Sequence, residues 1–147
     1  MHGILTDAWK MEYSYEIINQ KEAEKYAESK HIKTLMEHLI EDSTRHRKLV
    51  ADLFRMIGEN EPSSYQQKPL NFNFDRSTDR ELVQQIIWVE KKMVALYDKA
   101  LSLISEKDSY DFIAPDDLIK FRESLTMLIK WERLHQRMGE ETLAKID

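Results

Sequence analysis

The stretch 128–138, LIKWERLHQRM, limits what this chain can fold into more than any other feature of the sequence. Its apolar residues recur at helical spacing, and at about 100° per residue Glu132 and His135 lie one turn apart on one helical face. Phe121 and Leu125 share that face, so both polar groups are expected to point into a core. Burial of an ionisable pair among apolar side chains costs free energy unless a partner satisfies it, and a bound cation suits both groups.

The composition favours one all-helical domain. The chain has 147 residues, of which 41% are apolar and 33% are charged, and this is enough to close a single core. It contains only three Gly and three Pro. A net charge of −5 without a basic block argues against nucleic acid as a partner. No apolar run is long enough for a membrane span and the N-terminus does not resemble a signal peptide, so we expect a cytoplasmic protein without membrane contact.

Cysteine usage narrows the chemistry further. The chain has no Cys, which excludes disulfides, thiol catalysis, iron–sulfur clusters and thiolate zinc sites. A metal ion in this protein must therefore be held by Glu, Asp and His side chains.

The hydrophobic period predicts four helices in a single domain, residues 1–147, at about 7–27, 30–57, 78–105 and 115–145. Their starts carry capping signals, namely Thr6 or Asp7, Ser29, the box Thr78-x-x-Glu81, and Pro115 at a first helical position. The connector after Gly58 is long enough to cross the full height of a bundle. We therefore predict a four-helix up-down bundle with a long crossover between helices two and three.

The turn at Ser29 has an alternative. No Gly or Pro lies between Gly3 and Gly58, so the first two helices could instead form one unbroken helix of about fifty residues in a domain-swapped dimer.

Further carboxylates and imidazoles fall on the inward faces of the other predicted helices. Glu16 lies near the middle of the inward stripe of the first helix, with Glu12 one turn earlier, and Glu90 lies at the centre of the apolar face of the third. The stretch 39–49, LIEDSTRHRKL, aligns without gaps on 128–138. In that alignment His46 aligns with His135, and Ser43 aligns with Glu132. Asp42 is close enough to this face to turn inward.

This order of lone Glu, His helix, long crossover, lone Glu and Glu-x-x-His helix resembles the ferritin-like superfamily, and it is most similar to the ferritin-like domain of rubrerythrins. The resemblance covers residues from about 7 to 145. In that family, two lone Glu and two Glu-x-x-His pairs hold two irons between four helices, with one Glu bridging them. The ligands that the resemblance implies here are Glu16, His46, Glu90, Glu132 and His135, with Glu12 as an alternative to Glu16.

Two departures from the family pattern bear on the chemistry. Ser43 occupies a ligand position that is Glu in the family, so Asp42, Glu12 or water would have to compensate, or the site would hold a single ion. The chain also lacks a Cys-based rubredoxin domain, so a separate protein would have to donate electrons.

The resemblance implies a di-iron oxidoreductase. With one or two iron ions per chain, it would oxidise ferrous iron or reduce peroxide or oxygen, with Tyr13 or Tyr97 as electron donors. Mn or Zn would also suit the ligands. The alternatives are a non-catalytic metal-binding or storage protein, and a helical interaction module without metal in which Glu132 and His135 form a buried pair beside a protonated Glu90.

Apolar residues outside the inward stripes predict an exposed strip and hence a homodimer. These residues are Ile18, Ile40, Trp88 and Ile129.

Overall fold

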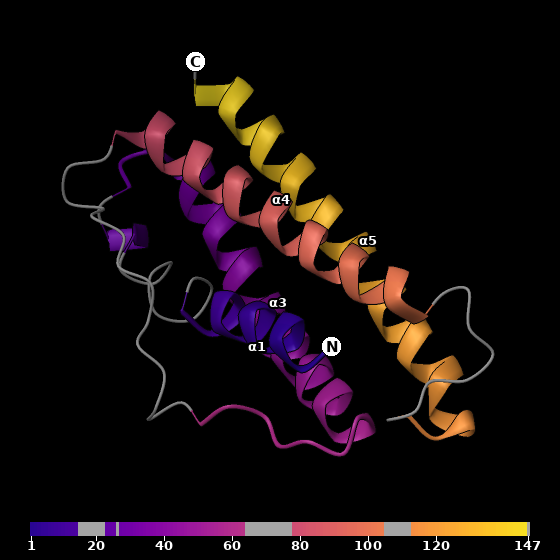
Figure 1. Ribbon diagram of the computed structural model, residues 1–147. Coiled ribbons are helices and arrows are strands. Elements are labelled where there is room, and N and C mark those ends of the chain that lie inside the picture. Colours follow the sequence, from indigo (N-terminus) through magenta and orange to yellow (C-terminus); the bar gives the residue numbers. More distant parts are fainter. Residues whose placement is uncertain (15–22, 26, 64–77, 105–112, 147) are drawn as a thin grey trace.

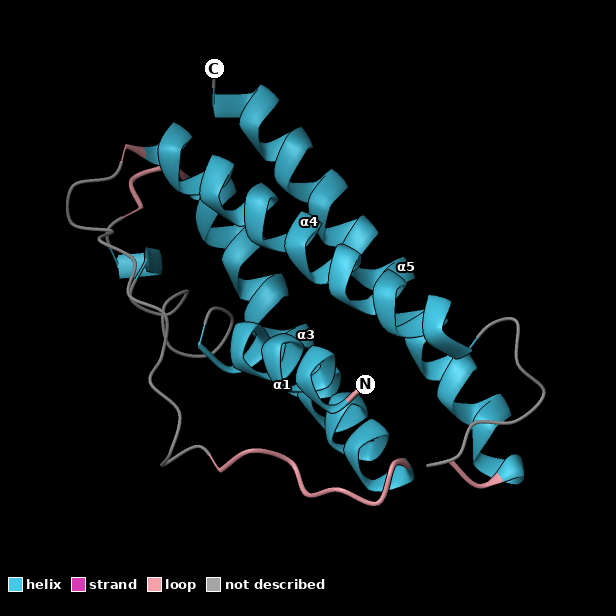
Figure 2. Ribbon diagram, viewed as in Figure 1, coloured by secondary structure: helices cyan, strands magenta, loops and turns pink. Residues whose placement is uncertain are grey.

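The structure, a computed structural model, describes residues 1–14, 23–25, 27–63, 78–104 and 113–146. These residues form helices and connecting turns without a β-strand (Figure 2). The helices are α1 (His2–Met11), α3 (Lys30–Met56), α4 (Asp79–Ile104) and α5 (Pro115–Ile146). The prediction of an all-α chain is therefore confirmed. A search of the described helices for an apolar segment that could cross a bilayer found none.

Ser29 separates α3 from the preceding chain. Residues 27–29 are not helical, and the Ser29 hydroxyl oxygen accepts a hydrogen bond from the His31 amide at 3.2 Å. The Ser29 amide in turn donates to Asp79 Oδ2 at 2.9 Å, which ties the start of α3 to the start of α4. The predicted cap is confirmed, and the alternative of one unbroken helix is wrong.

The starts of α4 and α5 follow their sequence signals. The Glu81 amide donates to Thr78 Oγ1 at 3.2 Å, and the Thr78 amide donates to Glu81 Oε2 at 3.3 Å, which is the reciprocal pattern of a capping box. Pro115 opens α5, where its missing amide hydrogen removes no helical hydrogen bond. Gly58 follows α3 at a φ of 74°, a conformation that favours glycine.

The first helix differs from its predicted bounds. It begins at His2, because the Thr6 hydroxyl donates to the His2 carbonyl at 2.9 Å inside the helix instead of capping its start. It ends at Met11 and passes into a π-helical turn at residues 12–14. The predicted continuation through residues 15–22 lies outside the described part of the chain.

The helices pack in antiparallel pairs around one core. In Figure 1, α4 and α5 run side by side. Arg122, near the start of α5, donates to the Ile104 carbonyl at the end of α4 at 2.6 Å. Near the other end, a Cβ atom on Gly139 would lie 2.8 Å from Cγ1 of Ile87, so glycine permits this close approach. In addition, α3 packs against α5, and α1 packs against both α3 and α4.

The predicted apolar strip is only partly exposed. Trp88 is 55% exposed, but Ile129 is 6% exposed because it packs within the core cluster. Ile40 is half-buried, and Ile18 lies outside the described residues. The prediction for Ile129 is therefore wrong.

Candidate metal centre

Five ionisable side chains meet in the core, where all are at most 1% exposed. They come from the turn after α1, from α3, from α4 and from two positions on α5, and they are Glu12, His46, Glu90, Glu132 and His135. Such a concentration of charge in an apolar interior is costly unless the groups satisfy one another or hold a cation.

Glu132 lies between the two histidines. Its Oε1 lies 2.6 Å from His46 Nδ1, and its Oε2 lies 3.5 Å from His135 Nδ1. Ligand atoms of these three residues all lie within 4.8 Å of one another. Because the carboxylate presents one oxygen to each imidazole, it is the member of the set best placed to bridge two ions or to bind one ion between the rings.

Each histidine also faces a second carboxylate. Glu12 Oε1 lies 3.6 Å from His46 Nδ1, and Glu90 Oε2 lies 3.7 Å from His135 Nδ1. The set therefore divides into two half-sites, one with Glu12 and His46 and one with Glu90 and His135, which share Glu132.

Three of the four separations between the histidines and the carboxylates are close to the spacing of two ligands of one ion, whereas the fourth, 2.6 Å from His46 Nδ1 to Glu132 Oε1, is a hydrogen-bonding distance. Two ligand atoms bound to one ion at about 2.1 Å lie about 3.0 Å apart at a right angle and about 3.4 Å apart at a tetrahedral angle. Three of the four separations are 3.5–3.7 Å, and the fourth is shorter.

Seven buried atoms of the set lack a hydrogen-bond partner among the described residues, and each such atom costs about 1–3 kcal/mol. They are Glu12 Oε2, His46 Nδ1, both oxygens of Glu90, both oxygens of Glu132, and His135 Nδ1. All seven are donor atoms that a divalent transition metal accepts, so the residues present fit a metal ion.

The π-helical turn at residues 12–14 places Glu12 in the centre. Such turns occur mostly as single insertions in helices, frequently at functional sites. The Tyr97 hydroxyl, buried on α4, donates to Glu12 Oε1 at 2.7 Å and holds this carboxylate in position. Glu16, the other acid predicted on this helix, lies outside the described residues.

Asp42 lies on the far side of His135 from the cluster. Its Oδ2 is 2.9 Å from His135 Nε2, whereas Nδ1 of the same ring faces the glutamates. With Nε2–H donated to Asp42, the imidazole directs its Nδ1 lone pair into the centre, which is how outer carboxylates orient histidine ligands of metals. Asp42 therefore contacts a candidate ligand and not the metal position itself. Its side chain is 34% exposed, so it also connects the centre with solvent.

Two of the aligned positions that differ between the half-repeats, 43/132 and 42/131, have distinct surroundings at the centre. The Ser43 hydroxyl donates to the Ile40 carbonyl of its own helix at 2.7 Å. Trp131, which aligns with Asp42, stacks on the His46 ring with centroids 5.2 Å apart and planes 5° apart. The sequence interpretation missed Trp131, although the alignment of 39–49 with 128–138 placed it opposite Asp42.

The electrostatics show how protons occupy this cluster in a metal-free chain. Burial lowers the pKa of His46, but Glu12 and Glu132 outweigh this and raise it to about 9. Burial likewise disfavours charge on His135, yet Glu132 and Glu90 raise its pKa to about 11. Burial and the neighbouring Glu132 raise the pKa of Glu90 well above its usual value.

Glu132 has the opposite shift. Burial alone would raise its pKa, but Glu90, His135 and His46 together lower it. In the metal-free cluster these shifts favour charge on Glu132 and on the two imidazole rings and disfavour charge on Glu90. Protons on the two rings would supply the positive charge that a metal ion would otherwise bring.

The two predicted tyrosines differ in position. Tyr97 reaches the centre through Glu12. Tyr13 is half-buried, with its ring stacked on Trp9 at 5.0 Å and covered by the Arg47 guanidinium at 5.4 Å. The sequence predicted Glu16, with Glu12 as its alternative, beside His46, Glu90, Glu132 and His135. The structure brings Glu12 together with the other four, and Glu16 lies outside the described residues.

No protein-family model matches this chain, and no curated protein and no solved structure matches it either.

Proposed function

We propose that this protein is a ferritin-like metal protein that binds one or two iron ions between its helices. The observation that carries the proposal is the convergence of three carboxylates and two imidazoles, all buried, with seven donor atoms left without hydrogen bonds among the described residues. Glu12 and His46 would hold one ion, Glu90 and His135 a second, and Glu132 would bridge them. If a single ion binds, His46, Glu132 and His135 are the nearest set.

The helix neighbours support the ferritin-like part of the proposal. Both α3 and α4 pack mainly against α1 and α5. This pattern of neighbours supports a long connector between opposite corners of a bundle, as in the crossover of this family.

The chemistry would be redox chemistry of a small oxidant. Bound iron would supply one-electron exchange between its ferrous and ferric states, with oxygen or peroxide as the oxidant. Because the ligands are at most 1% exposed, only a small molecule would reach them. Tyr97 would position Glu12 and is close enough to act as an electron donor, and Asp42 would orient His135 and exchange its proton with solvent.

Metal analysis of the purified protein, expressed with excess iron and kept away from chelators, tests the proposal. One or two irons per chain, lost in Glu132→Ala and retained in Glu123→Ala, would support it, because Glu123 is an exposed acid on the same helix. Iron binding with peroxide turnover would indicate an oxidoreductase, and tight binding without turnover would indicate storage. No metal, even after reconstitution, would overturn the proposal.

A metal-free interaction module is the second candidate, and the charge pattern of the cluster favours it. An ionised Glu132 between two imidazolium rings can remain folded without metal. The two candidates differ in what His135→Ala does to thermal stability. In a metal protein the substitution lowers the stability conferred by added metal, since the ligand linkage is lost. In a metal-free module the added metal has no effect on either protein.

A further inference from the structure

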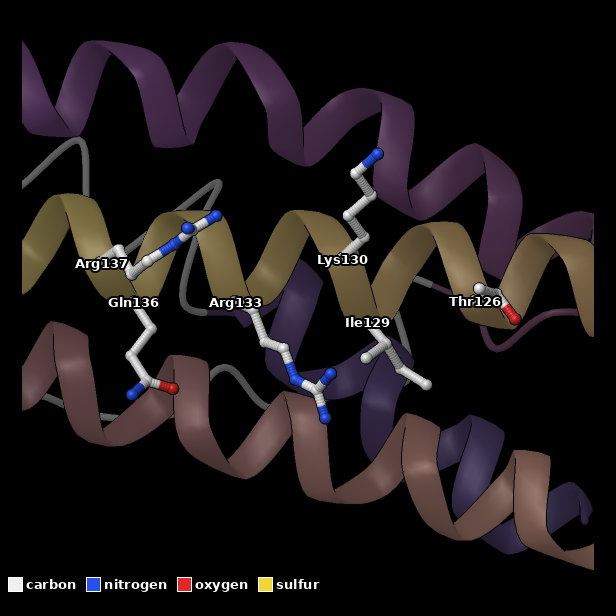
Figure 3. A pocket seen from close by; sticks show the side chains of 6 residues that line it. All are labelled: Thr126, Ile129, Lys130, Arg133, Gln136 and Arg137. Carbon is white, nitrogen blue, oxygen red and sulfur yellow. The ribbon is translucent and has the colours of Figure 1, made fainter.

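The outer surface of α5 carries a basic strip beside the metal centre. A shallow hollow on this helix is lined by Thr126, Ile129, Lys130, Arg133, Gln136 and Arg137. Figure 3 shows Ile129, Arg133 and Gln136 on the side of α5 that faces α4, with Lys130 pointing away from them. Every exposed charged residue between positions 126 and 137 is basic. Arg133 pairs with Asp98 of α4 at 3.6 Å, which leaves Lys130 and Arg137 as the cations at the outside of the strip.

Apolar side chains adjoin this strip. Met127 and Leu134 are each 44% exposed. With Trp131 between them at helical spacing, they form one stripe along α5. A large apolar side chain that remains in water on a charged helix marks a contact surface when several occur together beside polar residues.

The charge of this face selects the class of partner. The chain as a whole has a net charge of −5, and the exposed charges of residues 126–137 are positive, with the exposed acids Glu123 and Glu141 one turn beyond either end of this stretch. Complementary charge guides association and suppresses wrong partners. A segment with acids beside apolar side chains would match Lys130 and Arg137 next to Met127 and Leu134, and a second copy of this chain is the competing occupant that the test below distinguishes.

Trp131 connects the face with the interior. Its half-buried indole lies flat on the His46 ring, and His46 Nδ1 is 2.6 Å from Glu132 Oε1. A protein seated on this face would therefore contact the Trp131 ring, which stacks on a candidate metal ligand.

We propose that the face of α5 formed by Met127, Lys130, Trp131, Leu134 and Arg137 docks a carboxylate-rich segment of a partner protein. Met127 and Leu134 supply the apolar contact, and Lys130 and Arg137 pair with the partner's acids. The proposal concerns the surface alone, so it stands or falls independently of metal binding.

The test is a titration of the full-length, metal-free, ¹⁵N-labelled protein with a short synthetic amphipathic peptide of Glu, Leu and Ala. The indole N–H resonance of Trp131, assigned by its loss in Trp131→Phe, is the readout. Trp88 is an internal control, because it is 55% exposed on α4 and lies under the Lys92 ammonium at 5.1 Å. We expect the Trp131 resonance to move, the Trp88 resonance to stay, and added salt to weaken the binding.

Charge reversal provides the matched variants. The double change Lys130→Glu with Arg137→Glu should weaken peptide binding about tenfold or more, whereas Lys92→Glu should leave it unchanged. Equal shifts of both tryptophans, or binding that is insensitive to Lys130→Glu with Arg137→Glu, would overturn the proposal. Movement of the Trp131 resonance with protein concentration in the absence of peptide would also overturn it, since the face would then belong to a second copy. Metal content of the same variants, measured separately, reports on the centre and not on the surface.

Discussion

Helices α3 and α5 each place one histidine in the cluster at the same aligned position, but they supply different numbers of carboxylates to it. On α5, Glu132 places an oxygen against each imidazole, whereas the aligned Ser43 of α3 turns its hydroxyl back to its own helix. The residues one position earlier each contact the histidine of the other helix. Asp42 of α3 contacts His135, and Trp131 of α5 stacks on His46. The two helices thus share histidines at the same position and a contact from each helix to the histidine of the other, while the carboxylate of Glu132 faces both rings.

The largest effect is expected from Glu132→Gln, which keeps the side-chain shape and removes the shared negative charge. Metal affinity should fall by about 100-fold or more, since even the loss of an outer partner of a ligand costs about 10–100-fold. Isothermal titration of the metal-free protein with Fe²⁺ or Co²⁺ under nitrogen would measure it. Glu123→Gln, at an exposed position of α5, is the control. Equal affinities in the two variants would show that Glu132 is not a ligand.

A smaller loss is expected from Asp42→Asn. The amide would no longer fix the His135 ring with Nε2 protonated, so metal affinity should fall about 10–100-fold. Competition with a chromophoric chelator would measure it. Asp52→Asn is the matched control, because Asp52 lies on the same helix and contacts Arg55 at 3.0 Å, away from the histidines. A fall in metal affinity in both variants, or in neither, would show that Asp42 does not orient His135.

The difference between the two helices can be removed with Ser43→Glu, which gives α3 a carboxylate at the position aligned with Glu132. A second carboxylate between the half-sites should raise the affinity for the weaker ion about tenfold and bring the stoichiometry to two ions per chain. Without metal the same variant should melt at a lower temperature than the natural chain, because another buried acid is left unpaired. Elemental analysis and thermal melts with and without metal measure both effects. Ser43→Ala, which adds no carboxylate, should show no gain in stoichiometry, and a gain in it would contradict the explanation.

A separate effect concerns stability and not affinity: its pH dependence should have opposite signs in the metal-free and the metal-loaded protein. The folded-state pKa of His46 is raised to about 9 and that of His135 to about 11, so their contribution is complete below the unfolded value of 6.5 and is lost as pH rises, for His46 up to about 9 and for His135 up to about 11. The metal-free protein should therefore lose stability between pH 6.5 and 9.

Metal-loaded protein should become more stable over the same interval, because protons compete less with the metal. Thermal melts of both forms in matched buffers would show the two trends. Parallel trends would indicate that the added metal does not bind at the histidines.

The sequence predicted most of the helix ends because their causes are local. The cap at Ser29, the box of Thr78 with Glu81, and Pro115 depend on residues within one turn, and all three are confirmed. The start of α1 was wrong because Thr6 satisfies its hydroxyl inside the helix, an arrangement that a list of capping residues does not distinguish from a cap.

The centre was predictable as a set of residues but not as a geometry. Inward helical positions identified His46, Glu90 and Glu132, since periodicity gives direction. Periodicity does not give the rotation of one helix against another, so it could not show that Asp42 meets Nε2 of His135 or that Trp131 covers His46. Those contacts depend on how α3 and α5 pack.

The wide separation of the clustered residues along the chain has a kinetic consequence. Glu12 and Tyr97 are 85 positions apart, and Asp42 and His135 are 93 apart, so the centre cannot assemble until the ends of the chain have met. Long-range contacts stabilise the chain only after the entropy of closing the intervening loops has been overcome, which slows folding. An ion bound through contacts that form after the transition state would slow unfolding and leave the folding rate almost unchanged, so that it would prolong the lifetime of the native state without guiding the chain toward it.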